Sequence, residues 1–265
     1  MSLDIIVCVK QVMDPETPPS GFKIDQETKQ VVQTTGSSPV LNGFDENAVE
    51  AALRIKDITP ATITIVSVGK DFVMDVVKKP LAMGADNLVL LSDTHFETLD
   101  SFATATVLAA GIRKLGEPDL ILCGRQASDW DNAQVPLGLA EFLGLTCVTV
   151  AQKVDTDGTS LTIEQVSSDG YQEIMTTLPA LVTVSNEIGV PRYPTLRGIM
   201  AAGRKEPVIY SAADLNIDPE SLSPKVVVTD LYVPESNHEV EIISGEDDAD
   251  AGRKLALRMR EEGLI

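Results

Sequence analysis

Short apolar runs alternate with amphipathic stretches along the first two thirds of the chain. The runs are rich in β-branched and aliphatic side chains and occupy residues 5–9, 62–68, 87–91, 120–123, 147–150 and 180–184. Several of them are apolar at nearly every position, without a clean alternation. This pattern is typical of strands that are covered on both faces, as in a parallel sheet.

The segments between these runs have helical periodicity, at residues 45–56, 71–83, 100–115 and 135–143. In the first of them, Ala48, Ala51, Ala52 and Ile55 share one stripe. Alternating strands and helices predict right-handed crossovers and a mostly parallel sheet with helices on both faces.

The alternation of strands and helices ends after about residue 150. Two runs at 149–154 and 160–165 flank a turn and predict a hairpin, and a third run at 172–177 completes a small antiparallel layer. Five helix or strand breakers follow, which we expect to exclude a packed element there: Gly189, Pro191, Pro194, Gly198 and Gly203.

The chain ends in an amphipathic helix predicted at 247–262. We therefore divide the chain into an α/β domain at 1–190 and an extended arm at 191–265. Because the arm has apolar patches but no evident core, it needs another surface, most simply that of a partner subunit.

Composition narrows the class of protein. The 265 residues include 40 acidic and 21 basic side chains, for a net charge of -19. This balance argues against nucleic acid or an anionic membrane as the main partner, and it fits either docking to basic proteins or simply an acidic surface. No apolar stretch reaches the ~20 residues of a membrane span, and the N-terminus is too short and acidic for a signal sequence, so we expect a cytoplasmic protein without membrane insertion.

The segment 120–135 is the most informative of the chain. It reads Leu-Ile-Leu-Cys-Gly-Arg-Gln-Ala-Ser-Asp-Trp-Asp-Asn-Ala-Gln-Val. An apolar run ends in glycine, and polar groups precede the next helical pattern. In an open α/β sheet, this arrangement presents backbone N–H groups to an anionic ligand, so the segment predicts a nucleotide-binding loop. The alternative interpretation is a tight strand–helix turn with a capping aspartate.

Signatures of catalysis are missing from the sequence. There is no dinucleotide fingerprint, no phosphate-binding P-loop and no hydrolase or zinc-protease motif. His95 and His238 lie apart in predicted loops, and Asp129 and Asp131 have no third carboxylate nearby for a metal ion. The three cysteines (Cys8, Cys123 and Cys147) show no disulfide or zinc spacing. We therefore expect no catalytic residues and no metal site, and we interpret the chain as a binder or a carrier.

Several segments together resemble the beta subunit of electron transfer flavoproteins. They are Val7-Cys-Val-Lys-Gln-Val12, Asn42-Gly-Phe-Asp45 with the helix pattern after it, Leu81-Ala-Met-Gly-Ala-Asp86, the loop 124–135, Leu178-Pro-Ala-Leu-Val-Thr183, Pro191-Arg-Tyr-Pro-Thr-Leu-Arg-Gly-Ile-Met200 and the closing helix. Gly43 stands where the family usually has proline. The resemblance covers essentially the whole chain.

The resemblance implies a fold and a pocket. The fold is a Rossmann-like, mostly parallel sheet of the adenine nucleotide alpha-hydrolase-like type, with a small antiparallel layer and an extended C-terminal arm. The implied pocket consists of Cys8, Asn42, Gly43, Phe44, Asp45, Val68, Gly124, Arg125, Gln126, Ala127, Ser128, Asp129, Trp130, Asp131, Asn132, Ala133, Gln134 and Val135. Gly124 would allow a ligand to approach the backbone, and N–H groups of 131–134 would hold a phosphate.

The resemblance also implies partners and cofactors. The family forms a heterodimer with an alpha subunit, which binds most of the redox-active FAD near the subunit junction. The beta pocket holds AMP in most members and a second FAD in electron-bifurcating members. Trp130 fits neither group's usual residue, and we hypothesise that its bulk favours AMP.

Residues 191–200 resemble the family's recognition loop for acyl-CoA dehydrogenases. Leu196 stands in the place of the anchoring leucine, with Tyr193, Ile199 and Met200 beside it. The alternative is that Leu196 is tucked under the arm. The family's acidic residue that orients the flavin domain is matched by Gln172, with Glu173 adjacent, which leaves that role open.

The function that the resemblance implies is an electron shuttle from flavin dehydrogenases to a quinone oxidoreductase or a similar acceptor. Two alternatives stay open. One is the beta subunit of an NADH-dependent electron-bifurcating complex, and the other is a stand-alone nucleotide-binding α/β protein, which would be a stable monomer.

Overall fold

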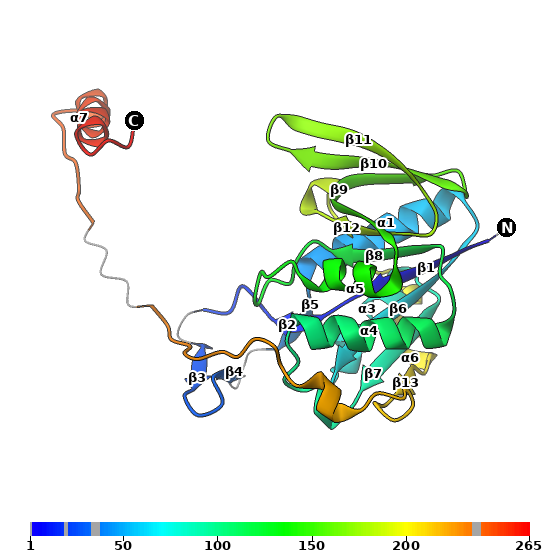
Figure 1. Ribbon diagram of the computed structural model, residues 1–265. Helices are drawn as coiled ribbons and strands as arrows, with labels where there is room; N and C mark the ends of the chain where they lie inside the picture. The colour runs from blue at the N-terminus through cyan, green and yellow to red at the C-terminus, as the bar shows by residue number, and fades with distance from the viewer. Residues whose placement is uncertain (1, 19–20, 33–37, 235–239) are drawn as a thin grey trace. The chain divides into compact units, whose positions relative to one another are not determined.

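Strand β1 (Leu3–Cys8) is a central strand of a nine-stranded sheet in the computed structural model, which describes residues 2–18, 21–32, 38–234 and 240–265 (Figure 1). The strand order is β11-β10-β9-β12-β8-β1-β6-β7-β13. The other strands are β6 (Ala61–Gly69), β7 (Asn87–Ser92), β8 (Leu120–Gly124), β9 (Thr146–Thr156), β10 (Ser160–Ser167), β11 (Gly170–Thr177), β12 (Ala180–Val184) and β13 (Val208–Tyr210). Pairing is parallel from β9 through β12 to β13, as the apolar runs predict.

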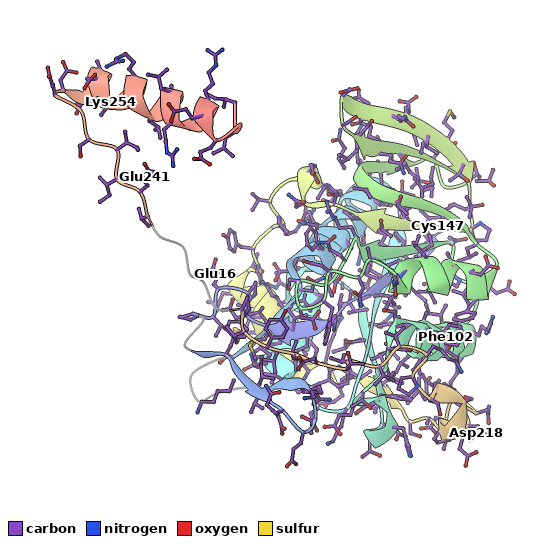
Figure 2. The ribbon with its side chains drawn as sticks, turned by 60° about the vertical axis from the view of Figure 1, so that its left-hand side comes forward. Glu16, Phe102, Cys147, Asp218, Glu241 and Lys254 are labelled. Atoms are coloured by element: carbon purple, nitrogen blue, oxygen red, sulfur yellow. The ribbon has the colours of Figure 1, made fainter. Side chains whose placement is uncertain are left out.

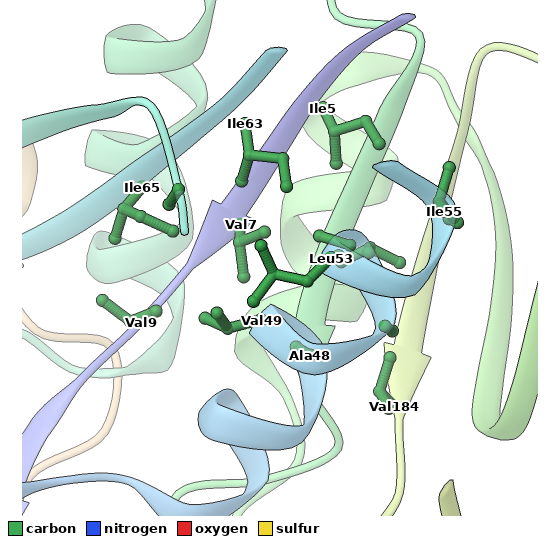
Figure 3. Packing of buried hydrophobic residues seen from close by; sticks show 14 of the residues in the cluster. Ile5, Val7, Val9, Ala48, Val49, Leu53, Ile55, Ile63, Ile65 and Val184 are labelled. Carbon is green, nitrogen blue, oxygen red and sulfur yellow. The ribbon is translucent and has the colours of Figure 1, made fainter. Parts of the chain in front are cut away.

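Helices cover both faces of this sheet. Side chains of β1 alternate between two cores, with Ile5 and Val7 in one and Ile6 and Cys8 in the other. The first core is closed by α1 (Gly43–Ile58), whose Ala48, Val49 and Leu53 pack on β1 (Figure 3). The second is closed by α4 (Ser101–Leu115) and α5 (Val135–Leu143). Two such cores are what a strand buried on both faces requires.

The predicted helix at 71–83 is divided into α2 (Met74–Val77) and α3 (Lys79–Met83). Pro80 has no N–H to continue the hydrogen bonding of α2, so the chain bends at Lys78 and starts a new helix. Five short strands were not predicted. Strand β2 (Gln11–Met13) pairs with β5 (Pro39–Leu41), β3 (Lys23–Asp25) pairs with β4 (Gln30–Val32), and β13 pairs with β7.

The predicted antiparallel strands are confirmed as β9, β10 and β11, and they continue the main sheet. Strand β9 is long enough to pair in parallel with β12 near its start and antiparallel with β10 along its later part. The sheet therefore changes from parallel to antiparallel at β9.

The expectation that breakers exclude a packed element after Val184 is wrong. Helix α6 (Leu196–Arg204) forms there, with Thr195 as its N-cap; Thr195 Oγ1 accepts a hydrogen bond of 3.0 Å from Gly198 N. Glycine is required at position 198, because a Cβ there would collide with the Ala82 carbonyl oxygen of α3. The glycine is thus a packing contact between two helices.

The chain divides into units Met1–Thr229 and Asp230–Ile265, so the first unit extends beyond the boundary we predicted at residue 190. Residues 191–229 join it because α6 packs on α3 and β13 pairs with β7. Short 3-10 helices η2 (Thr94–Phe96), η3 (Asn186–Ile188) and η4 (Pro219–Leu222) complete this unit.

The second unit contains the predicted closing helix, α7 (Asp248–Glu261). Asp247 caps it by accepting a hydrogen bond of 2.8 Å from Asp250 N. No residue of α7 is buried, and Figure 2 shows its side chains, Lys254 among them, spread around the helix. Among the described helices of both units, none is long and apolar enough to cross a membrane.

Candidate functional site

The sheet places its topological switch point between β1 and β8. The chain passes from β1 to β6 and β7 on one side of β1 and then crosses to β8 on the other side. In open α/β sheets, ligands bind outside the carboxyl ends of the strands at such a point. Cys8, Val68 and Gly124 lie at or near the carboxyl ends of β1, β6 and β8, so the structure brings these three predicted residues to one edge.

Asn42 ties the loop 124–135 to the start of α1. Its side chain is almost fully buried, at 1% exposure. Asn42 Nδ2 donates to the Gln126 carbonyl oxygen at 2.8 Å, and Asn42 Oδ1 accepts from Ser128 N at 3.2 Å. An amide is the side chain that can serve a carbonyl and an N–H at once. These two hydrogen bonds hold the first half of the loop against the start of α1.

Asp45 holds the ends of β1 and β8 together. Asp45 Oδ2 accepts from Lys10 N at 2.7 Å and Oδ1 accepts from Gly124 N at 3.2 Å. Burial raises the pKa of this carboxyl to about 7, although the N–H donors act in the opposite direction. Asp45 is therefore a buried structural carboxyl beneath the loop.

Gly124 is required by the packing of α1. A Cβ on Gly124 would lie 2.7 Å from the Phe44 carbonyl carbon and 2.8 Å from Asp45 N, and it would also collide with Asp45 Oδ1. The space beside Gly124 is thus filled by the first turn of α1. Close approach of a ligand, which we predicted as the reason for this glycine, stays a prediction beside this packing requirement.

Lys10 is a site residue that our sequence reasoning missed. Its Nζ lies 2.6 Å from Asp129 Oδ2, so a residue two positions beyond the end of β1 forms an ion pair with the loop after β8. The signal in the sequence was a lysine directly after a buried strand, at the edge where parallel strands end. Arg125 is a second nearby cation, with its guanidinium 5.4 Å from the centre of the Phe44 ring.

The second half of the loop is exposed. Trp130 is 49% exposed, and Asp131 and Ala133 adopt positive φ angles of 50° and 53°. Asp131 N donates to the Ala127 carbonyl oxygen at 2.8 Å. By contrast, the N–H groups of 132–134 donate to no other described residue, and α5 begins directly after them without a side-chain cap. Free N–H groups at a helix start are suited to an anion.

Both aspartates of the loop are paired with neighbouring side chains. Within the described ranges, no cluster of three histidine, cysteine or acidic residues has the geometry of a metal site. Asp129 pairs with Lys10, and Asp131 Oδ1 accepts from Gln126 Nε2 at 2.8 Å. A hydrogen bond with Cys8, together with burial, raises the pKa of the Cys123 thiol and disfavours the reactive thiolate.

Of the two histidines, only His95 lies in the described part of the chain, and it is not among the residues of this edge. His95 is exposed in η2, with Nδ1 2.7 Å from Asp93 Oδ1. His238 falls outside the described residues.

The residues predicted to bind a partner protein are all exposed. Tyr193 is 85% exposed, Leu196 77%, Ile199 53% and Met200 57%. We call these four residues the docking surface. Leu196, Ile199 and Met200 form one stripe of α6, and the buried side of this helix is marked by Ala202. Leu196 is not covered by any residue of the first unit, and its role as an anchor stays a prediction.

We predict that Asn42→Ala loosens the loop. The Gln126 carbonyl and the Ser128 N–H would each lose their partner in a buried setting, at a cost of ~1–3 kcal/mol in the free energy of unfolding. Thermal unfolding, together with the rate of limited proteolysis within 124–135, measures the effect. Asn87→Ala is the control, because that exposed amide makes only a 3.3 Å contact with Thr64 Oγ1. Equal behaviour of the two variants would contradict the anchoring role of Asn42.

Comparison with known proteins identifies the family. The model of the electron transfer flavoprotein domain matches residues 30–215. The electron transfer flavoprotein subunit beta of Thermoanaerobacterium thermosaccharolyticum is 38% identical over 99% of this chain and 100% of its own length. This chain belongs to the electron transfer flavoprotein beta-subunit family.

Further relatives extend the range of names within this family. The subunit beta of Clostridium acetobutylicum is 39% identical over 84% of both chains. The caffeyl-CoA reductase-Etf complex subunit CarD of Acetobacterium woodii is 34% identical over 98% of this chain and 99% of its own. Both the candidate loop and the docking surface lie inside the segment that matches the electron transfer flavoprotein domain.

Proposed function

We propose that this chain is the beta subunit of a heterodimeric electron transfer flavoprotein that shuttles electrons from acyl-CoA dehydrogenase-type donors to a quinone oxidoreductase or a similar acceptor. The observation that carries the proposal is similarity along the full length of a beta subunit. The redox-active FAD, held mainly by the alpha subunit, supplies the electron chemistry. This chain contributes geometry and makes and breaks no substrate bonds.

We propose that the loop 124–135 holds AMP. The residues fit an adenine nucleotide in kind: unpaired N–H groups at 132–134 suit its phosphate, and Asn42 and Asp45 hold the loop rigidly at the switch point. The pocket would comprise the eighteen positions named from the resemblance, with Lys10 added. Trp130, half exposed above the loop, is the residue whose bulk would exclude a larger dinucleotide.

Two alternatives use the same site. A second FAD in place of AMP would make the chain part of an NADH-dependent bifurcating complex, for which bleaching of a beta-bound flavin by NADH is the sign. The relative from A. woodii is named as a subunit of a caffeyl-CoA reductase complex, which adds a CoA-linked reductase to the partners worth testing.

We assign the docking surface to the dehydrogenase and the second unit to the alpha subunit. Four large side chains exposed together on or beside one helix form the kind of apolar patch that marks a protein interface. Helix α7 has no buried residue, while Leu255 and Leu257 are about half exposed, so a partner surface would give it the apolar contact it lacks. Acidic charge would favour encounters with basic partners.

Co-expression with an alpha subunit tests the proposed function. We expect a yellow complex with the mass of a heterodimer whose flavin is bleached by an acyl-CoA dehydrogenase and its substrate. A stable, nucleotide-bound monomer that does not associate with the alpha subunit would contradict the proposal and favour the stand-alone alternative.

Leu196→Ala is expected to raise the KM for the dehydrogenase by ~10-fold or more without changing flavin content, since an anchoring side chain contributes 2 kcal/mol or more. Steady-state transfer from a reduced dehydrogenase measures this. Ile58→Ala, which truncates an equally exposed side chain at the end of α1, is the matched control. The assignment of the docking surface fails when both variants behave like the wild type.

A further inference from the structure

A cluster of charged side chains fastens the segment before α6 to α1. Arg192 Nε donates to Glu50 Oε2 at 2.9 Å, and Arg192 N donates to the same oxygen at 3.0 Å. Arg192 Nη2 reaches Glu50 Oε1 at 3.3 Å and Asp57 Oδ2 at 2.7 Å. A single arginine therefore bridges two carboxylates of α1 through its side chain and its backbone.

Glu50 lies at the buried centre of this cluster. The residue is only 5% exposed, and it is one of the few buried charged residues of the described chain. Its Oε1 also accepts from Arg54 Nε at 3.0 Å, one turn further along α1. The hydrogen bonds from Arg192 and Arg54 keep the pKa of Glu50 below its usual value despite burial. A buried carboxylate with both oxygens used in this way fixes the positions of its partners.

The segment around Arg192 is held at further points. Arg54 Nη1 donates to the Ile188 carbonyl oxygen at 2.9 Å, which fastens η3 to α1. On the other side, α6 lies against α3 through Gly198, where even a Cβ would collide with the Ala82 carbonyl. The docking surface is thus fixed on both sides, by charge on α1 and by close backbone packing on α3. Its large side chains are left exposed.

We propose that Glu50, Arg192 and Asp57 form a clamp that holds the docking surface in its binding conformation before a partner arrives. This inference rests on the proposed docking function of α6. Glu50 and Arg192 are positioning residues, because the partner would contact the exposed Tyr193 and Leu196, while Glu50 is buried and acts on this segment through Arg192. Pre-ordering matters because a partner otherwise has to order the segment itself, which weakens apparent affinity.

The variant Arg192→Lys tests the clamp in the intact heterodimer. Lysine keeps the charge but loses the planar fork that reaches two carboxylates. We expect faster hydrogen exchange of the amides in 190–204. We also expect the KM for a reduced acyl-CoA dehydrogenase to rise. If one tenth of the variant molecules keep the binding conformation of the docking surface, the KM rises about tenfold. The kcat at saturating dehydrogenase and the flavin content should not change.

Arg204→Lys is the matched control, since it makes the same substitution on an exposed arginine of α6, outside both the clamp and residues 191–200, and should leave both readouts at the wild-type level. Asp57→Asn removes only the exposed half of the clamp, where the carboxylate is 58% exposed, and should raise KM and exchange by less. That variant decides the matter if Arg192→Lys does not yield a heterodimer.

Unchanged exchange or unchanged KM in Arg192→Lys, or in Asp57→Asn where only that variant folds, overturns the clamp. A wild-type heterodimer that no acyl-CoA dehydrogenase reduces would contradict the proposed function instead. In that case, hydrogen exchange of the amides in 190–204 still tests the clamp.

Discussion

Gly124→Ala is expected to lower the free energy of unfolding by about 3 kcal/mol and the melting temperature of the heterodimer by roughly 5–10 °C. The added methyl group would collide with the first turn of α1, at Phe44 and Asp45, where the neighbours are largely backbone atoms that cannot rotate away. Either α1 moves away from β8 or the loop 124–135 moves away from α1. Both movements separate the residues that form the candidate nucleotide site, so bound nucleotide should be lost as well.

Gly43→Ala is the matched control, because it lies in the same turn and a Cβ there meets no atom within 4 Å. Differential scanning calorimetry of the two variants beside the wild type measures the difference. A melting temperature for Gly124→Ala equal to that of Gly43→Ala would mean that the packing of α1 on β8 is looser than the structure describes.

Asp45→Asn is expected to change how stability depends on pH. Burial raises the folded-state pKa of Asp45 to about 7 from 3.8, so between these values the folded state binds the proton more tightly than the unfolded state does. The stability that this group contributes is fully present below pH 4 and is lost as pH rises through 7. The wild type should therefore lose roughly 3–5 kcal/mol relative to Asp45→Asn between pH 4 and pH 8.

Urea unfolding of both proteins at several pH values from 4 to 8 tests this expectation, and the difference between them isolates Asp45 from the many exposed carboxylates. Asp71→Asn replaces an exposed carboxylate and is the control. Its free energy of unfolding should change with pH in the same way as that of the wild type. A difference that instead grows in favour of the wild type with rising pH would show that the N–H groups of Lys10 and Gly124 hold Asp45 ionised.

The main sheet follows from local pattern. Runs such as 5–9 are apolar on both faces, which is typical of a parallel strand covered on both sides. The helical stripes between the runs predict the order of the elements. The pairing of β7 with β13 could not be predicted in this way, since Val208–Tyr210 is too short to give a period.

Long-range contacts explain what sequence reasoning missed. Helix α6 contains two glycines and follows two prolines, and only the contact of Gly198 with the backbone of Ala82 makes one of those glycines an advantage. The ion pair between Lys10 and Asp129 joins residues far apart in sequence, so the position of Lys10 after a buried strand marks the lysine but not its partner. The pocket positions came from the resemblance, and the structure adds why Asn42, Asp45 and Gly124 are the residue types required there.

The central claim is that this chain holds an adenine nucleotide at the loop 124–135 while the working flavin is shared with an alpha subunit. The most direct test is the content of a heat-denatured extract of the purified heterodimer, separated by chromatography. We expect FAD and AMP in equal amounts, each matching the amount of heterodimer. Two flavins per heterodimer without AMP would contradict the AMP assignment, and a flavin with no second nucleotide would contradict the site itself.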